Sequence, residues 1–154
     1  NFSVFQKEEL LRSPDSVVLS LAPVDPRSLI QGDYMRIRYA ASVKAEMQKD
    51  LADGFIFVKQ DKKGVHQFSS ISGLNGNPKE GEIKIRFRKR GSIVRIGAES
   101  FFFQEGDAKF YENAKYGLLK VSPAGDVLLA GLMDEKMKLI VPQKKTDLEH
   151  KEEN

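Results

Sequence analysis

Residues 82–88, Glu-Ile-Lys-Ile-Arg-Phe-Arg, alternate charged and apolar side chains without a break, and the charged residues after Glu82 are all basic. Successive side chains of a β-strand point to opposite faces, so the three apolar residues share one face and the cations share the other. Two such faces are typical of a strand with one side on a core and the other in water. Arg90-Gly91 predicts a turn into a second strand within Ser92–Gly97. This hairpin indicates an antiparallel β-structure.

Similar patterns predict strands on both sides of this hairpin. Asp33–Ala41 alternates, and its apolar residues Met35, Ile37 and Tyr39 share one face. Apolar or β-branched runs bounded by turn residues are typical of further strands. These runs lie at Ser16–Ala22, Phe55–Lys59, Val65–Ile71, Leu118–Val121, Val127–Leu132 and Lys136–Val141. Short turns such as Asp61–Gly64 join several of them into hairpins.

Short helices are expected between the strands. Helical spacing of apolar residues predicts them at Val4–Leu11, Ser42–Asp53 and Gly106–Tyr116. Gly54 is typical of a helix end, and Pro26 begins a single helical turn with Asp25 as its N-cap. About eight strands with two or three short helices predict a mostly β (α+β) fold, an antiparallel sheet curled into a barrel or sandwich.

The composition fits one soluble domain and excludes several classes of protein. Of the 154 residues, 40% are hydrophobic and 31% charged, a balance typical of a globular protein. We expect one domain over 1–142 and a charged flexible tail at 143–154. No apolar run reaches the ~18 residues of a membrane-spanning helix. The absence of Cys excludes disulfides and thiolate metal sites.

The net charge of +3 is small, but the charge is unevenly distributed. Residues 83–96 carry six basic side chains and no acidic one. Phe87 is the single aromatic residue among these cations, which falls short of a platform for stacking bases, so we expect no nucleic-acid partner. Two histidines without a carboxylate cluster do not make a metal site, and there is no phosphate-binding glycine loop. No metal or cofactor is therefore expected.

Residues 32–39, Gly-Asp-Tyr-Met-Arg-Ile-Arg-Tyr, resemble the motif that names the GDYxxLxY proteins, with Ile37 where the motif has Leu. Residues 23–29 and 95–106 are also similar to that family. The resemblance covers nearly the whole predicted domain. It implies a bacterial, functionally uncharacterised protein, and it supplies no catalytic residue.

Members of that family typically carry one membrane-spanning helix ahead of this domain. The resemblance therefore implies that residues 1–12 are a helical lead-in from an anchor that precedes Asn1. We expect a domain tethered to the bacterial inner membrane, on its periplasmic or extracytoplasmic side. It would act by binding a membrane partner, another envelope protein or anionic lipid headgroups.

The first candidate binding site lies at the motif loop. We expect Asp25, Arg27 and Asp33 to converge on a polar site at the start of a strand, with Tyr34 completing it. The alternative is loop architecture, since Asp and Gly at loop ends are typical turn residues. In that case Asp25 caps a turn and Arg27 pairs with Asp33 or a carbonyl group. Gly32 would then supply a positive φ.

The second candidate is a basic face. Arg36 and Arg38 share one face of their strand, while Arg86 and Arg88 share one face of theirs together with Lys84. If the two strands are neighbours in one sheet, these cations line a single surface suited to anionic lipid headgroups. The alternative is a solvated face whose cations are offset by acids from elsewhere in the fold.

A small hydrolase remains the alternative function. Glu99 and Glu105 bracket an aromatic run, and two carboxylates near an apolar wall can act as an acid–base pair. The structural alternative pairs one of them with Arg95. Ser28 loosely resembles the nucleophile of the serine/lysine signal-peptidase type. The Met and Pro expected directly after that nucleophile are absent, and no Lys lies in an apolar setting that would activate it.

Overall fold

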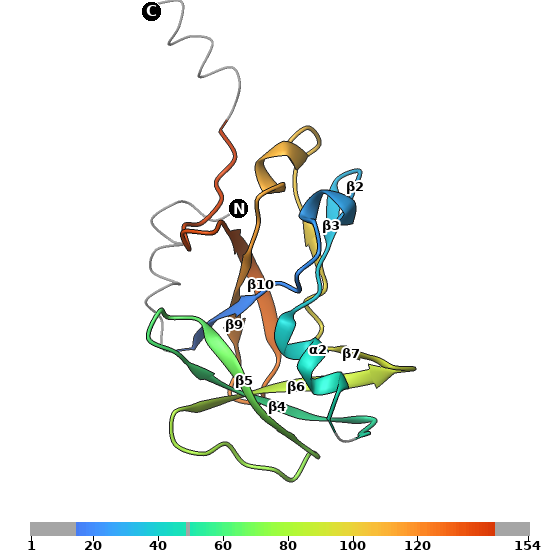
Figure 1. The fold of residues 1–154 in the computed structure, drawn as a ribbon, viewed down its shortest axis with the longest axis vertical. Helices are drawn as coiled ribbons and strands as arrows, with labels where there is room; N and C mark the ends of the chain where they lie inside the picture. The colour runs from blue at the N-terminus through green and yellow to red at the C-terminus, as the bar shows by residue number, and fades with distance from the viewer. Residues whose placement is uncertain (1–14, 49, 144–154) are drawn as a thin grey trace, which may run out of the picture.

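The computed structural model describes residues 15–48 and 50–143. These residues form ten strands in three antiparallel sheets, one α-helix and two short 3₁₀ helices (Figure 1). The predicted mostly β, antiparallel fold is confirmed, and it curls as a half-barrel. The helix predicted at Val4–Leu11 and all but the first residue of the predicted tail lie outside the described residues. None of the described helices is long and apolar enough to cross a membrane.

The largest sheet contains the alternating stretch at 82–88. Its strand order is β5 (His66–Ser72), β4 (Asp53–Gln60), β6 (Glu82–Arg90) and β7 (Ile93–Arg95). Ile85 and Phe87 are buried, whereas Arg88 and Arg90 are exposed. Each hairpin predicted for this region is present, because the apolar face of β6 needs a core and its turns are short.

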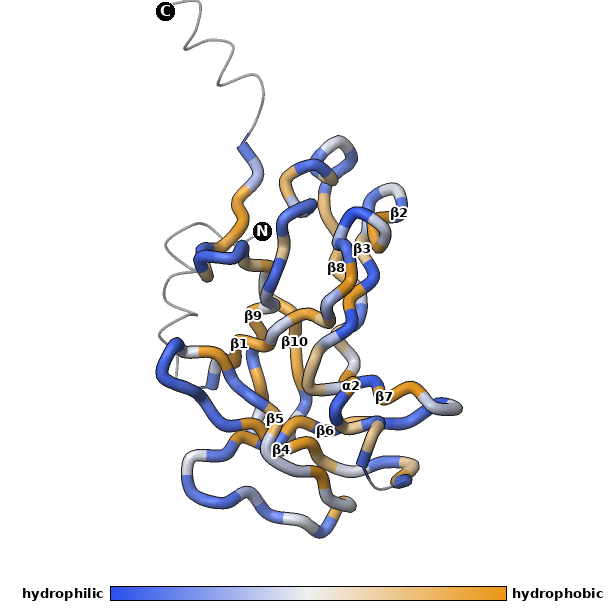
Figure 2. Tube along the Cα trace, in the orientation of Figure 1, coloured by the Kyte–Doolittle hydropathy of each residue, from blue (hydrophilic) through white to orange (hydrophobic). Residues whose placement is uncertain are grey.

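A second sheet has the order β1 (Ser16–Ser20), β9 (Tyr116–Val121) and β10 (Val127–Met133). Successive residues Leu118 and Leu119 of β9 point to opposite faces and both are completely buried. The central strand is therefore covered on both sides. Figure 2 shows apolar stretches along these strands and polar stretches in the turns that connect them.

A small third sheet carries the motif. Its order is β2 (Ile30–Gln31), β3 (Tyr34–Arg36) and β8 (Ser100–Phe102). The 3₁₀ helix η1 (Pro26–Leu29) precedes it, and the helix α2 (Ala40–Glu46) follows β3. The predicted apolar face is confirmed, because Met35, Ile37 and Tyr39 are all buried. The strand itself is shorter than the predicted Asp33–Ala41.

The helix predicted at Ser42–Asp53 ends early. α2 stops at Glu46, and Met47, which was expected on its buried face, is 77% exposed. Gly54 is not a helix end but lies in β4, where an added Cβ would stand 2.0 Å from the carbonyl oxygen of Ser72. The glycine is required by close strand pairing, which outweighs the helical spacing of the preceding apolar residues.

Two other predicted elements are largely replaced by turns. Of the helix expected at Gly106–Tyr116, only the 3₁₀ helix η2 (Ala108–Tyr111) forms. Of the strand expected at Lys136–Val141, only a single bridge between Leu139 and Met133 forms. The carboxylate of Asp134 accepts the amides of residues 136 and 138, so the chain turns back where an extended strand was expected.

Tyr39 joins all three sheets. Its backbone bridges Leu21, next to β1, and its carbonyl accepts the amide of Val43 in α2. A Cβ added at Gly117 of β9 would lie 3.1 Å from its ring. Its hydroxyl donates to the carbonyl of Ala98, between β7 and β8, at 2.6 Å. Burial raises the pKa of Tyr39 well above its ordinary value, so the phenol stays a neutral donor.

Two further contacts fix the first two sheets against each other. The amide of Val18 in β1 donates to Nδ1 of His66 in β5 at 3.2 Å, and this imidazole is 6% exposed. The amide of Arg86 in β6 donates to the carbonyl of Gly125, in the turn between β9 and β10, at 2.9 Å. β7 pairs only with the end of β6, so the turn occupies the edge that β7 leaves open.

Replacing Tyr39 by Phe is expected to lower the free energy of unfolding by about 1–3 kcal/mol, because the buried carbonyl of Ala98 loses its donor. Urea denaturation measures this change. Tyr34→Phe is the matched control, since it removes an exposed hydroxyl bond to Gln31 and should change stability by less than about 0.5 kcal/mol. Equal effects in the two variants would contradict the role assigned to Tyr39.

His66 is expected to make stability fall as the pH drops below about 6.5. Burial lowers its pKa in the folded protein, with Asp61 partly opposing, so the unfolded chain takes up the proton first. At a pH above the pKa of His66 in the unfolded chain, neither the folded nor the unfolded state binds the proton, so the titration of His66 does not change the stability there. His66→Asn offers Val18 an acceptor that does not titrate, so the stability difference from the native protein should depend on pH only in this window. A difference that is constant between pH 5 and 8 would contradict the assignment.

Candidate functional site

The predicted cap at Asp25 forms. The carboxylate accepts the amide of Arg27 at 3.0 Å and pairs with its guanidinium at 3.4 Å, and more than half of each side chain is exposed. The hydrogen bond from that amide is the main reason, and the hydrogen bond from the guanidinium the second, that the pKa of Asp25 lies below its ordinary value. The hydroxyl of Ser28 donates to the carbonyl of Asp25 at 2.7 Å. The capped turn is the one that the loop interpretation predicts, but the partner predicted for Arg27 is wrong, because within the described residues its guanidinium pairs with Asp25 and not with Asp33 or a carbonyl group.

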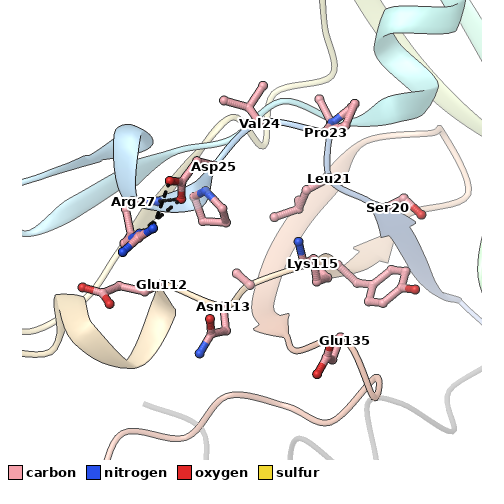
Figure 3. A pocket seen from close by; sticks show the side chains of 14 residues that line it. Ser20, Leu21, Pro23, Val24, Asp25, Arg27, Glu112, Asn113, Lys115 and Glu135 are labelled. Atoms are coloured by element: carbon pink, nitrogen blue, oxygen red, sulfur yellow. Dashed lines mark hydrogen bonds and ion pairs between the residues drawn. The ribbon is translucent and has the colours of Figure 1, made fainter.

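A hollow of about 880 Å³ lies beside this turn, and we call it the loop hollow. Figure 3 shows the Asp25–Arg27 pair at one side of it, with other polar side chains around the opening. These side chains are those of Glu112, Asn113, Lys115 and Glu135. The lining is of mixed charge, so the loop hollow has no strong preference for an anion or a cation.

The other two motif-loop candidates lie outside the loop hollow. Tyr34 donates its hydroxyl to Gln31 at 2.7 Å and packs its ring against Phe102, with the ring centres 5.8 Å apart. The carbonyl of Asp33 accepts the amide of Phe103. Gly32 has φ +63°, as a tight turn between β2 and β3 requires. The structure therefore divides the four expected residues between an ion-paired turn and a hairpin.

The premise of the basic face is wrong. β3, which carries Arg36, and β6, which carries Arg86 and Arg88, belong to different sheets. Strand neighbours depend on long-range pairing, which alternation within each strand does not specify. The segment from β7 to β8 nevertheless connects the two groups of cations, because Arg95, Glu99 and Ser100 line two adjoining hollows.

The first of these hollows, which we call the arginine hollow, has a volume of about 640 Å³. Its charged and aromatic lining consists of Arg86, Phe87, Arg88, Arg90, Arg95, Glu99, Phe102 and Asp126. Four guanidinium groups thus face two carboxylates. The oxygens of Glu99 already accept the amides of Ile96 and Gly97 at 2.7 and 2.9 Å. The excess of donors makes this hollow a candidate site for an anionic group.

Arg86 has a distinctive environment within this hollow. Its Nε is buried and has no hydrogen-bond partner among the described residues. An unpaired buried donor is costly, and guanidinium geometry suits two oxygens of a phosphate or carboxylate. Among the described residues that line this hollow, Arg86 therefore carries a buried donor that the fold leaves without a partner.

The second hollow, which we call the serine hollow, has a volume of about 370 Å³. It is lined by Leu29, residues 36–39, Ser42, residues 93–95, Glu99 and Ser100. Glu46 of α2 forms part of its framework, because its carboxylate accepts the amide of Val94 at 2.8 Å and pairs with Arg38. Arg38 is therefore held by an acid of the fold, whereas within the described residues no ion pair holds an arginine of the arginine hollow.

The predicted acid–base pair does not share a site. Glu99 lines both adjoining hollows, whereas Glu105 lies in an exposed turn after β8 and lines neither. The hydroxyl of Ser28, the candidate nucleophile, donates a hydrogen bond to the carbonyl of Asp25 and so takes part in the loop. Within the described residues, no group of three or more His, Asp or Glu side chains is arranged to hold a metal ion.

Three residues at or beside these hollows, the buried Tyr39 and Ser42 and the partly buried Glu46, were not among the predicted site residues. Tyr39 was assigned only to an apolar face, although it is the last residue of the motif. Ser42 and Glu46 lie on a helix whose pattern did not distinguish them from solvated polar residues. The helical spacing of Val43, Met47 and Leu51 points Val43 and not its neighbour Ser42 inward, so the local pattern contained no signal for Ser42.

Replacing Glu46 by Ala is expected to lower the free energy of unfolding by about 1–3 kcal/mol, because the amide of Val94 and the guanidinium of Arg38 both lose their acceptor. Glu46→Gln should cost less, since it retains an oxygen for Val94. Glu112→Ala removes an exposed carboxylate and serves as the control in thermal or urea unfolding. A Glu46→Ala variant as stable as this control would contradict the framework role.

Comparison with known proteins agrees with the motif. A family model described as GDYXXLXY protein matches residues 1–132. No curated protein and no solved structure matches the chain. The matched region includes the hairpin that carries the motif, the buried Tyr39 and all the arginines of the arginine hollow. The chain therefore belongs to the GDYXXLXY family.

Proposed function

We propose that this domain is a membrane-tethered binding module of the bacterial envelope, and that its arginine hollow binds the phosphate groups of anionic lipids. The tether and the extracytoplasmic location are what the family resemblance implies. The ligand class is argued from the hollow itself. Binding, not catalysis, is the proposed activity.

The unpartnered Nε of Arg86 is the observation that carries this proposal. A buried donor without a partner is rare, and a bound oxyanion would supply the missing acceptor. Arg88, Arg90 and Arg95 line the same hollow and are exposed, so they would reach the same group at little cost in rearrangement. The two carboxylates in the lining offset only part of this charge.

An exposed aromatic ring in the lining of the hollow favours a lipid surface over a dissolved anion. Phe102 is 72% exposed and lies against the ring of Tyr34. Large apolar side chains are seldom left in water without a reason, and aromatic rings are favoured at the boundary between headgroups and acyl chains. Arginines that face phosphates beside a ring that faces acyl chains suit the surface of a membrane.

The test is co-sedimentation of the chain with vesicles made of equal parts phosphatidylcholine and phosphatidylglycerol. Each cation near an anionic surface contributes about 1 kcal/mol, so Arg88→Ala/Arg90→Ala should weaken partitioning roughly 30-fold. Lys62→Ala/Lys63→Ala removes two exposed cations from the turn between β4 and β5 and is the matched control, with a much smaller loss expected.

Pure phosphatidylcholine vesicles should bind the native chain weakly, and added salt should reduce binding to the mixed vesicles. Equal losses in the two double variants would mean that net charge, and not the arginine hollow, determines binding. No binding of the native chain to the mixed vesicles would contradict the lipid proposal. An acidic envelope protein would then be the next ligand to test.

A further inference from the structure

The serine hollow combines an apolar wall with exposed cations at its opening. Ile37, Tyr39 and Val94 are at most 3% exposed and form part of the wall. Arg36 and Arg95 are exposed at the hollow, and Ile93 next to them is 40% exposed. A lining of this kind is typical of small-molecule sites, in which apolar surface supplies affinity and a few polar groups fix the orientation.

Ser42 is the polar group that the fold leaves unsatisfied in this wall. It is 2% exposed, and its Oγ has no hydrogen-bond partner within the described part of the chain. A serine in a helix commonly donates to a carbonyl one turn earlier, but Ser42 makes no such bond. The hydroxyl of Tyr39, a residue that lines the same hollow, donates to the carbonyl of Ala98. A buried hydroxyl in this position favours a ligand oxygen as its partner.

The acids near the hollow leave two of its cations available. Arg38 is paired with Glu46, and the carboxylate of Glu99 accepts two backbone amides. Within residues 15–48 and 50–143, no ion pair holds Arg36 or Arg95. A negatively charged ligand group would therefore meet two guanidinium groups that the fold does not already use.

We propose that the serine hollow is a binding site for a small anionic amphiphile, a carboxylate or phosphate group joined to a short apolar chain. The anionic group accepts hydrogen bonds from Ser42 Oγ and from the guanidinium groups of Arg36 and Arg95. The apolar chain covers Leu29, Ile93 and Val94, which line the same hollow. The site does not depend on the proposed lipid-surface binding, because Arg88 and Arg90 do not line it.

The test is isothermal titration of the chain with sodium octanoate and, separately, with octyl phosphate. Saturable binding of at least one is expected, and the comparison identifies which anionic head the site prefers. Acetate and inorganic phosphate carry the charge without the chain, and octyl glucoside carries the chain without the charge. All three should bind at least tenfold more weakly, because each lacks one half of the interaction.

Two variants test the residues that carry the proposal. Ser42→Ala should weaken binding about five- to tenfold while leaving the melting temperature unchanged or raised, because it removes a hydroxyl that has no partner in the fold. Arg36→Gln should weaken binding at least tenfold. Ser70→Ala, at an exposed position in β5, and Arg90→Gln, in the arginine hollow alone, are the matched controls and should bind as the native chain does.

Four results would overturn the inference. The first would be that neither amphiphile shows saturable binding. The second would be that octyl glucoside binds as tightly as octanoate. The third would be that Ser42→Ala and Arg36→Gln both bind octanoate as tightly as the control variants do. A large drop in the melting temperature of Ser42→Ala would also overturn it, because the hydroxyl would then have a structural partner. Arg88→Ala/Arg90→Ala should retain octanoate binding and lose vesicle binding, so failure of one proposal is distinguishable from failure of the other.

Discussion

The hydrogen bond from the hydroxyl of Tyr39 to the carbonyl of Ala98 is the contact on which the arrangement of the three sheets depends. It ties the strand that carries the motif to the connection between β7 and β8, while the ring fills space that Gly117 of β9 leaves open. The same residue begins α2 and bridges the end of β1. Because the phenol is fully buried, losing its acceptor leaves an unsatisfied polar group and not a solvated one.

This position gives the family motif a structural meaning. Its glycine forms the turn between β2 and β3, its first tyrosine closes that hairpin through Gln31, and its last tyrosine lies in the core. The motif therefore builds the scaffold, whereas the charged hollows form beside it. The connection from β7 to β8 runs between two sheets, and Arg95 and Glu99 on it line both hollows. A site of this kind is only as stable as the packing of Tyr39 that holds the connection in place.

The candidate site could be predicted from the sequence only where its chemistry is local. The cap formed by Asp25 follows from its position directly before a proline that begins a helical turn, and the structure contains it. The grouping of Arg36 with Arg86 depends on which strands pair, and alternation within a strand carries no information about its neighbour. The partners of Glu46 are an arginine eight residues earlier and an amide 48 residues later, which no local pattern specifies.

The sequence by itself determined most of the strands and turns and the faces that point inward, because side-chain alternation and turn residues act over a few residues. It also determined that the chain is one mostly β domain with its cations concentrated on β6 and β7. Only the tertiary structure decided that α2 ends at Glu46, that Gly54 belongs to a strand, and that the residues 136–141 turn back. It also decided which cations meet in one hollow and which buried hydroxyl lacks a partner. All of these outcomes depend on contacts between residues that are distant in the sequence, where packing and hydrogen-bond satisfaction outweigh local preference.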